Sequence, residues 1–537
     1  MKQNWDLPAF TDFKGATYTY RDVARKIEKL HILFTHAGIV PGDRIAICGR
    51  NSSHWAIVAL ASLTYGTVAV PILHDFKPDT VHHLVSHCEA KLLFTDASTW
   101  DNLDHENMPH IKGVLQISDY ALLFCRNKRL EEARLKLNKL FGDKYPERFT
   151  PDDVSYQSFE PSQLALINYT SGSMGFSKGV MLSYRSLWSN IQFSIDGLKF
   201  LLPGDGMISM LPLAHMFGLS IEMLHPFVKG CHIYFLTKTP SPKIIMEAFA
   251  EVHPKLIIAV PLIIEKIIRT RVFPMLDKPV MKILLSLPII DKKLLGKIKD
   301  KLEQVFGGQL KQIIVGGAPL NKDVETFLRK INFPYTVGYG MTECGPLISY
   351  APWDEIRPAS CGKIVDRMQV RIDSPDPVNV PGVLYVKGDN VMDGYLNNPE
   401  ETAVALDKDG WLRTGDIAQI DADGFIYIRG RDKNMILGPS GQNIYPEEIE
   451  QILNNLPYVA ESLIVSRDGK LFALIYPDLD SARRQGMDNN AINKQMEENI
   501  RRLNEQIPAF SQVSGFKIFD EEFEKTPKRS IKRYLYQ

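Results

Sequence analysis

The sequence lacks any surplus of charge: its 537 residues carry 63 basic and 63 acidic side chains, so the formal net charge is zero. A protein that grips nucleic acid through its phosphates needs a basic surplus to displace counterions, so nucleic acid is excluded as the main partner. The six cysteines are scattered, with no Cys-x-x-Cys pair or other metal-ligand spacing. This pattern argues against a zinc site and predicts free thiols in a reducing compartment.

Targeting signals and membrane spans are also missing. The N-terminus, MKQNWDLPAF, is neither a signal nor a transit peptide, which predicts a cytoplasmic protein. Residues 55–73 carry no charge, but Gly66 and Pro71 divide them, so they are predicted to form a buried helix followed by a buried strand, with no transmembrane span. Residues 256–290 are apolar but broken by prolines and charges. They predict a pair of core helices and leave peripheral contact with a membrane surface open.

The first third of the chain alternates helical and strand patterns. Apolar residues at helical spacing from 23 to 34 are followed by Gly38 and then by the apolar strand 44–49. Repeated alternation of this kind predicts α/β layers. The stretch 100–151 is more polar and is expected to run over the surface.

A chain of this length exceeds the size at which a single core stops growing, so at least two domains are expected. Short strands separated by Pro, Gly and Asp predict a small β-rich subdomain at about 355–430, within an N-terminal domain of α/β layers at 1–431. The charged run RGRDKN then precedes a helix whose first turn contains Pro446. These signals predict a hinge near 432–433 and a small α+β C-terminal domain at 434–537.

The segment YTSGSMGFSKGV, residues 169–180, combines glycines, hydroxyls and a lysine. Gly172 and Gly175 let backbone N–H groups approach anionic oxygens, and Lys178 adds a full positive charge. The hydroxyl donors are Thr170, Ser171 and Ser173. The spacing G-x-x-G-x-x-K between two strands differs from the P-loop, which requires G-x-x-x-x-G-K-[ST] before a helix. The segment therefore predicts a nucleotide-phosphate loop in which hydroxyls and Lys178 carry the charge without a helix dipole.

Further segments follow in a fixed order. The strand QIIV leads into GGAPL, where Gly316 and Gly317 permit close approach of the backbone to a flat ligand, and Asn321 is a predicted N-cap. The other segments are YTVGYGMTECGP with Tyr339, Thr342 and Glu343, GWLRTGDIA with Asp416, and GRDK with Arg431.

With these segments in this order, nearly the whole chain resembles the adenylate-forming (AMP-binding) superfamily of acyl-CoA ligases, carrier-loading adenylation domains and luciferases. The resemblance implies an AMP-forming acid–thiol ligase, which joins a carboxylic acid to AMP and then passes the acyl group to CoA. It implies ATP, CoA and the acid as substrates, Mg²⁺ as cofactor, and a mobile C-terminal domain.

The resemblance also implies a role for each matching position. The loop 169–180 would hold the β and γ phosphates, Thr342 would contact the α phosphate, and Glu343 would hold Mg²⁺. The adenine would be enclosed by Gly316, Gly317, Ala318, Pro319 and Tyr339. Asp416 would accept the ribose hydroxyls with support from Arg431. His215 would lie near the acyl group, Lys433 would be the hinge, and Gly441 would line the pantetheine tunnel. Lys532 would be the mobile catalytic lysine between carboxylate and α phosphate, acting with Lys178, Thr342 and Glu343.

Several positions depart from the family pattern or have a second interpretation. Ser530 and Ile531 precede Lys532 where the family has Ser-Gly, and Lys528 is close by, so a solvated basic tail is the alternative. Met174 also replaces a hydroxyl residue of the loop. His215 is equally compatible with a core histidine.

The acid is predicted to be a medium- or long-chain fatty acid. Three flexible methionines near His215 suit an adaptable apolar pocket, although core packing would explain them as well. They are Met210, Met216 and Met223. Two alternatives to an acid:CoA ligase stay open: an enzyme that loads an acyl or peptidyl carrier protein, and a nucleotide-binding scaffold without catalysis.

Overall fold

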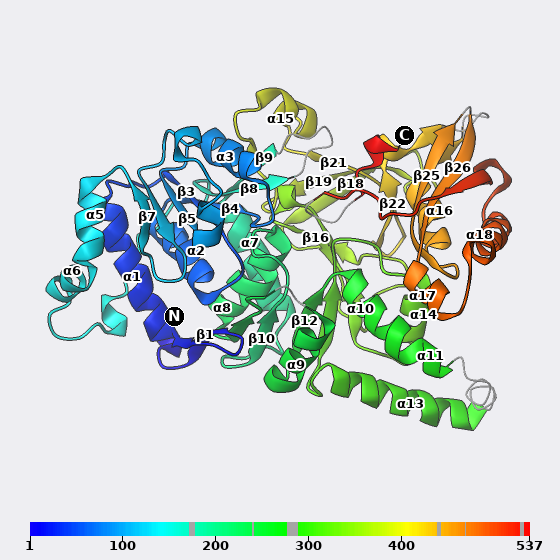
Figure 1. Ribbon diagram of the computed structural model, residues 1–537, viewed down its shortest axis with the longest axis horizontal. Helices are drawn as coiled ribbons and strands as arrows, with labels where there is room; N and C mark the ends of the chain where they lie inside the picture. The colour runs from blue at the N-terminus through cyan, green and yellow to red at the C-terminus, as the bar shows by residue number, and fades with distance from the viewer. Residues whose placement is uncertain are drawn as a thin grey trace.

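The computed structural model describes most of the chain, in seven ranges. These are residues 1–170, 178–238, 241–276, 288–437, 442–467, 469–526 and 531–536. Figure 1 shows a large N-terminal body and, at the right of the view, a smaller lobe that contains β25, β26 and α18. Among these residues no helix combines the length and the apolar character needed to cross a bilayer.

An eight-stranded mixed sheet forms one half of the N-terminal body, in the order β20-β9-β8-β4-β3-β5-β6-β7. Its strands are β3 (Arg44–Cys48), β4 (Val68–Ile72), β5 (Leu92–Thr95), β6 (Gly113–Gln116), β7 (Leu122–Cys125), β8 (Leu164–Thr170), β9 (Lys178–Ser183) and β20 (Gly394–Tyr395). The central strands β8, β4, β3, β5 and β6 are parallel, and β4 is buried at every position. Continuous burial of this kind explains why these strands are apolar runs without alternation.

The helices of this half include the two that the sequence predicted, α1 and α2. The helices are α1 (Tyr20–His36), α2 (Ser53–Tyr65), α3 (Pro78–His87), α4 (Ala97–Trp100), α5 (Lys128–Leu135) and α6 (Leu137–Lys144). Thr19 and Asp22 form a capping box at the start of α1, and Gly38 takes a left-handed φ of 64° just after its end. The uncharged run 55–73 is the buried helix α2 followed by β4, as predicted.

Two further sheets form the other half. The sheet β10-β11-β1-β2 joins the start of the chain to residues 206–235, because β1 pairs with β11 in parallel. Its strands are β1 (Pro8–Asp12), β2 (Thr17–Thr19), β10 (Gly206–Ser209) and β11 (His232–Phe235). The parallel sheet β12-β13-β14 contains β12 (Leu256–Ala259), β13 (Gln312–Val315) and β14 (Tyr335–Val337). The nearby helices are α7 (Tyr184–Gly197), η4 (Gly218–Leu224, a π-helix), α8 (His225–Lys229), α9 (Pro242–Val252), α10 (Pro261–Ile267), η5 (Ile268–Val272, a π-helix), α11 (Phe273–Leu276), α13 (Pro288–Val305) and α14 (Lys322–Lys330).

Short antiparallel strands fill residues 339–431. They are β15 (Tyr339–Gly340), β16 (Leu347–Tyr350), β17 (Lys363–Ile364), β18 (Met368–Asp373), β19 (Gly382–Gly388), β21 (Leu412–Ile420) and β22 (Ile426–Arg431). The short helices of this region are η6 (Thr342–Cys344) and α15 (Pro399–Ala405). The sheet β18-β19-β21-β22 has the character expected from the pattern of short strands and turn residues.

The C-terminal lobe follows η7 (Asp432–Asn434). Its elements are β23 (Ile436–Leu437), β24 (Asn443–Ile444), α16 (Pro446–Leu453), β25 (Val459–Arg467), β26 (Lys470–Pro477), α17 (Leu479–Arg484), α18 (Asn489–Asn504), β27 (Val513–Ile518) and η9 (Arg533–Leu535). Leu453 of α16 and Leu503 of α18 are fully buried in one core with Ile464 of β25. The lobe is therefore an α+β unit with its own core.

Two element predictions were wrong. The stretch 100–151 was expected on the surface, but β6 and β7 extend the central sheet, and Val114 and Leu115 are fully buried. β6 and β7 are each only four residues long and are separated by polar turns. The average composition of the stretch 100–151 therefore does not reveal these two apolar strands. Residues 256–259 were expected in a helix but form the buried strand β12, because a short apolar run has no period that separates the two structures.

Candidate active site

The predicted phosphate loop spans the turn between two paired strands. Thr170 ends β8 and lies opposite Lys178, which begins β9. Ser171, Gly172, Ser173 and Gly175 lie outside the described residues. The Lys178 ammonium forms an ion pair with Glu401 of α15 and lies over the ring of Tyr395, 4.9 Å from its centroid. Lys178 is thus paired with the carboxylate of Glu401 at the start of β9.

Tyr395 connects Lys178 to the predicted metal ligand. Its hydroxyl donates to Oε1 of Glu343 at 3.0 Å, and Glu343 is only 9% exposed in the short helix η6. The second carboxylate oxygen can serve a cation. Mg²⁺ commonly binds through one or two carboxylates together with substrate phosphates and water, so a single carboxylate near Lys178 fits such an ion. Thr342, half-buried, precedes Glu343 in η6.

Three predicted residues meet at a buried carboxylate. Asp416 of β21 is 3% exposed, and it pairs across the sheet with Arg431 of β22. The Arg431 Nε lies 2.8 Å from Oδ1, and the Tyr339 hydroxyl donates to Oδ2. Burial raises the pKa of Asp416, and the positive charge of Arg431 opposes that rise. A carboxylate held in this way presents fixed acceptor oxygens, which suits recognition of a diol.

The turn after β13 carries Gly316 and Gly317, the residues predicted to let the backbone approach a flat ligand. A Cβ on Gly316 would lie 2.9 Å from the ring of Phe217, and Gly317 has a φ of +87°. Both positions therefore require glycine, for close packing and for a left-handed backbone respectively. Ala318 and Pro319 follow on the exposed side of the turn, and Asn321 caps α14 through the N–H groups of Asp323 and Val324, as predicted.

Phe217 belongs to the segment that carries His215. The carbonyl of Ala214 accepts a hydrogen bond from Asn168 Nδ2 at 2.8 Å, which ties the segment to strand β8. His215 is half-buried, and its backbone N–H donates to the carbonyl of Pro212 at 2.9 Å. The structure therefore places His215 near both the phosphate-loop strand and the Gly316 turn. The nearby methionines Met210, Met216 and Met223 are all buried in hydrophobic cores.

The residue predicted to be the hinge lies near the same charges. Lys433 in η7 has its pKa lowered by burial and then by the positive charges of Arg431 and Lys178. Gly441 lies outside the described residues. The structure thus brings Lys178, Tyr339, Glu343, Asp416, Arg431 and Lys433 into one electrostatic neighbourhood.

Lys532 is not part of that neighbourhood. Its ammonium pairs with Glu524, and its backbone N–H bonds to the carbonyl of the same residue at 2.8 Å. The hydrogen bond to Glu524 raises the pKa of Lys532, and the charge of Glu524 with Tyr534 and Tyr536 raises it further, all within its own segment. The next residue, Arg533, pairs with the buried Glu450 of α16. The tail is therefore fastened to the C-terminal lobe in this conformation.

Sequence reasoning missed several supporting residues. Asn190 of α7 bonds to the carbonyl of Cys344 at 3.1 Å and accepts the N–H of Leu347 at 2.9 Å, so it fixes the turn after Glu343. Glu401 and Tyr395 stand in the segment GYLNNPEET, more than 200 positions from Lys178. A single sequence carries no signal that pairs these distant positions.

Comparison with known proteins identifies the family to which the chain belongs. The described residues combine a two-lobed α/β fold (Figure 1) with a cluster of charged side chains that includes Lys178, Glu343 and Asp416. The model of the AMP-binding enzyme family matches residues 1–396, and the model of the AMP-binding enzyme C-terminal domain matches residues 433–536. The chain belongs to the AMP-binding enzyme family, which confirms the predicted adenylate-forming superfamily and its class of AMP-forming enzymes.

Curated relatives and solved structures agree with this family. The chain is 27% identical over 462 residues to long-chain-fatty-acid–CoA ligase ACSBG2 of Gallus gallus, covering 80% of this chain and 59% of that protein. It is 28% identical over 474 residues to 4-coumarate:CoA ligase 1 of Petunia hybrida, covering 83% of this chain and 76% of that protein. The structure of o-succinylbenzoate CoA synthetase of Bacillus subtilis with ATP and magnesium ion superposes with a TM-score of 0.74 at 19% identity, covering 98% and 96% of the two chains. This likeness confirms the predicted fold class.

Proposed function

We propose that the chain is an ATP-dependent acid:CoA ligase that forms an acyl adenylate and then a CoA thioester. The observation that carries the proposal is the buried Asp416 carboxylate, held by Tyr339 and Arg431 within reach of the charges of Glu343 and Lys433. Such a group suits the ribose of a nucleotide whose phosphates extend toward Lys178. The relatives named above include CoA ligases for fatty, coumaric and succinylbenzoic acids, which supports the reaction type and leaves the acid to be identified.

Charge explains why these residues would accelerate adenylation. A carboxylate that attacks a triphosphate brings two anions together, and preorganised positive charge in a dry site is the strongest available stabilisation of that approach. Lys178 would exchange its ion pair with Glu401 for the β and γ phosphates, and Thr342 would contact the α phosphate. Glu343 would hold Mg²⁺, which supplies further positive charge when bound.

Lys532 would complete the site only after movement of the C-terminal lobe. Its present pairing with Glu524 keeps it away from the nucleotide residues. A rotation at Lys433 would present it to the α phosphate in the first step and withdraw it for the second, as in hinge closures that sequester a reactive intermediate.

A medium- or long-chain fatty acid is the proposed substrate, supported by the apolar segment around His215 and by the fatty-acid ligase among the relatives. A carrier protein as acceptor is the first alternative. The second alternative is a nucleotide-binding scaffold without catalysis. It is suggested by Met174, Ser530 and Ile531, where the sequence differs from the family pattern.

One assay tests the function. Purified protein is given ATP, Mg²⁺ and a panel of acids from acetate to long fatty and aromatic acids, and acid-dependent exchange of pyrophosphate into ATP is measured. We expect exchange with at least one apolar acid and, on addition of CoA, formation of its thioester. A thioester on carrier protein but not on CoA would favour the first alternative, and nucleotide binding without exchange for any acid would favour the scaffold.

The mobile lysine gives a sharper prediction. Lys532→Ala should reduce acid-dependent exchange by about a hundredfold or more, because it removes one preorganised positive group from the transition state. The same variant should still convert a supplied acyl adenylate to thioester. Lys528→Ala is the matched control and should leave both steps near wild type; equal loss of both steps in Lys532→Ala would contradict this division of labour.

A further inference from the structure

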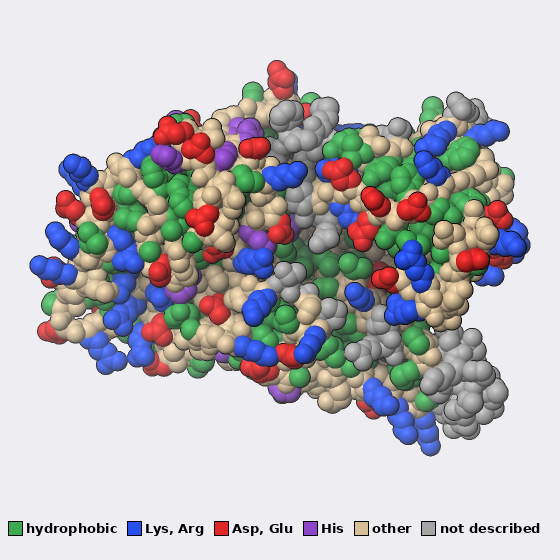
Figure 2. All heavy atoms as spheres, viewed as in Figure 1, with side chains coloured by type: hydrophobic (Ala, Val, Ile, Leu, Met, Phe, Trp, Pro, Cys, Tyr) green, Lys and Arg blue, Asp and Glu red, His purple; other side chains and the backbone are tan. Residues whose placement is uncertain are grey.

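A second group of positive charges lies at the other end of the molecule. Figure 1 places α1, α5 and α6 at the end of the long axis opposite the C-terminal lobe, and Figure 2 shows Lys and Arg side chains gathered there with some Asp and Glu among them. A cavity of about 250 Å³ opens at this end. It is lined by Lys26, Lys29, Asp119, Tyr120, Arg134, Leu135, Leu137 and Asn138. None of these residues belongs to the candidate active site.

The charges of this cavity do not cancel. The lining contains three cations, Lys26, Lys29 and Arg134, and one carboxylate, Asp119, which gives it a formal net charge of +2. Burial lowers the pKa of Lys29, and the neighbouring charges of Arg25, Lys26 and Arg134 lower it further. The cations therefore repel one another within a partly desolvated space, where an anion would be attracted more strongly than at an open surface.

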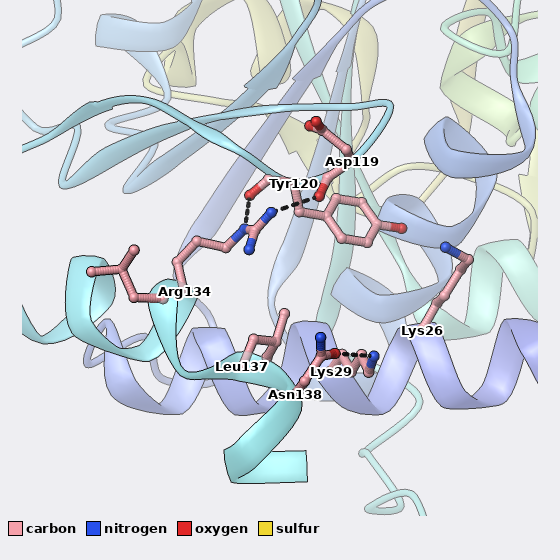
Figure 3. A pocket seen from close by; sticks show the side chains of 8 residues that line it. Lys26, Lys29, Asp119, Tyr120, Arg134, Leu137 and Asn138 are labelled. Carbon is pink, nitrogen blue, oxygen red and sulfur yellow. Dashed lines mark hydrogen bonds between the residues drawn. The ribbon is translucent and has the colours of Figure 1, made fainter. Parts of the chain in front are cut away.

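Each cation is held in place by a bond that leaves other donors available. Lys29 donates one N–H to Asn138 Oδ1 at 2.7 Å, and Lys26 lies 3.1 Å from His54 Nε2. A lysine ammonium has three N–H groups, so each has donors left for a ligand. Arg134 is fixed by its Nε on the carbonyl of Tyr120 at 2.5 Å and by a second nitrogen on the carbonyl of Asp119 at 3.1 Å, the two bonds drawn in Figure 3.

Tyr120 adds a buried donor that lacks a partner. Its side chain is 5% exposed, its ring packs edge-on against His54 and Phe94, and its hydroxyl has no hydrogen-bond partner among the residues that the structure describes. In Figure 3 the hydroxyl points toward the Lys26 ammonium. Burial raises the pKa of this hydroxyl well above its usual range, so it stays a donor at every physiological pH. A buried hydroxyl without a partner costs free energy, and an anion in the cavity would remove that cost.

We propose that this cavity is a binding site for a small oxyanion with two negative charges, of the chemical class of inorganic phosphate. The net charge of the lining matches a dianion, the donors are ammonium and phenol groups, and the volume admits a tetrahedral oxyanion. The site lies apart from the nucleotide residues and is independent of the proposed ligase activity.

The test uses inorganic phosphate as the probe, at constant ionic strength, with chloride and acetate as comparison anions. Binding is measured by calorimetry and by thermal shift on the full chain carrying Lys178→Ala, which removes the phosphate lysine of the candidate active site. We expect saturable phosphate binding and at least tenfold weaker binding of acetate. Lys29→Met should weaken phosphate binding about tenfold or more, because it deletes a charge-assisted hydrogen bond.

Tyr120→Phe separates a ligand role from a structural one. Without phosphate this variant should unfold at the same or a higher temperature than its parent, because it loses only an unpaired buried hydroxyl. Its phosphate-dependent rise in unfolding temperature should be smaller, with affinity about threefold to tenfold lower. Lys139→Met, which removes an exposed lysine of the adjacent helix α6 outside the lining, is the matched control and should bind phosphate as its parent does. Phosphate binding that is absent, or equal in Lys29→Met, Tyr120→Phe and Lys139→Met, would overturn the proposal.

Discussion

Two buried carboxylates, Asp416 and Glu222, hold neighbouring groups of the candidate site in place. Asp416 is held by Tyr339 and Arg431, whereas Glu222 of η4 is completely buried and accepts the backbone N–H groups of Met210 and Leu211 at 3.0 and 2.9 Å. Those two N–H groups begin the segment that carries His215. Glu222 therefore fixes the backbone on which the predicted acyl-site histidine is placed.

The pH dependence of stability should report Glu222. Burial raises its pKa to about 8, far above that of an unfolded glutamate. The native state then keeps a proton that the unfolded chain releases, so this group lowers stability as pH rises from about 5 to 8, by at most about 1.4 kcal/mol per pH unit. Glu222→Gln cannot ionise and retains an acceptor oxygen. Its unfolding temperature, relative to wild type, should therefore increase from pH 5 to pH 8.

Calorimetry at pH 5, 6, 7 and 8 measures this difference. Glu521→Gln, at an exposed position, is the control and should show a constant offset across the series. A constant offset for Glu222→Gln as well would mean that the carboxyl group titrates normally in the folded protein.

At the scale of elements, Arg533 attaches the C-terminal tail to α16, through an ion pair with the buried Glu450 and a longer one, of 3.9 Å, with the half-buried Glu447. Glu450 accepts the N–H of Ile464 at 2.7 Å and pairs with Arg533, the neighbour of Lys532. Burial raises the pKa of Glu450 to about 7, against the opposing charge of Arg533. The same contact thus holds α16 on β25 and keeps the segment of Lys532 on the lobe.

Arg533→Met should loosen this lobe. Removal of one partner leaves a buried carboxylate with a single backbone donor, a change that typically costs about 3 kcal/mol. The carboxyl group can escape part of the cost by taking up a proton, so the loss should be smaller at pH 6 than at pH 8. Hydrogen exchange of the β25 amides in the full chain is the measurement, and faster exchange is expected.

Two further variants make that result specific. Glu450→Gln combined with Arg533→Met should restore much of the protection, because the buried carboxylate at position 450 is then removed as well. Arg501→Met removes an arginine that pairs with Glu498 and Glu505 on the exposed face of α18, and exposed pairs contribute little. It should leave exchange of β25 unchanged; unchanged exchange in Arg533→Met would show that the pair does not hold α16 on β25.

On the scale of the whole molecule, several polar contacts between described residues join the two lobes. Asn455, just after α16, bonds to Asn321 at the start of α14 and to Arg269 of η5, the latter at 3.3 Å. Gln451 donates to the carbonyl of Leu320 at 3.3 Å. Polar contacts of this kind can exchange with water at low cost, which suits a lobe that changes its position during a reaction cycle.

The proposed hinge can be tested by restricting one dihedral. Lys433→Pro would fix φ near −65° and limit rotation between the lobes. Adenylation and thioester formation, measured separately, should then be affected unequally, with one step slowed at least tenfold more than the other. Lys433→Ala, which keeps backbone freedom, is the control. Equal slowing of both steps by the proline would contradict a hinge at this position.

The sequence by itself determined the order of the motifs and most local structure. Gly38 after α1, the Asn321 cap and the strands on both sides of the phosphate loop depend on backbone conformation and on hydrogen bonds between near neighbours, so a single sequence records them. The sequence also identified the family, because a set of motifs in a fixed order along the whole chain is more specific than any single motif.

Only the tertiary structure decided which distant residues meet. The ion pair of Lys178 with Glu401, the support of the Glu343 turn by Asn190, and the cavity between α1 and the β6–β7 turn each join positions with no sequence relation. Such contacts arise when packed layers bring remote segments together and burial then selects the partners that satisfy each charge. The two strand errors have the same cause, since the pairing that makes β6 and β12 into strands is supplied by their neighbours in the sheets.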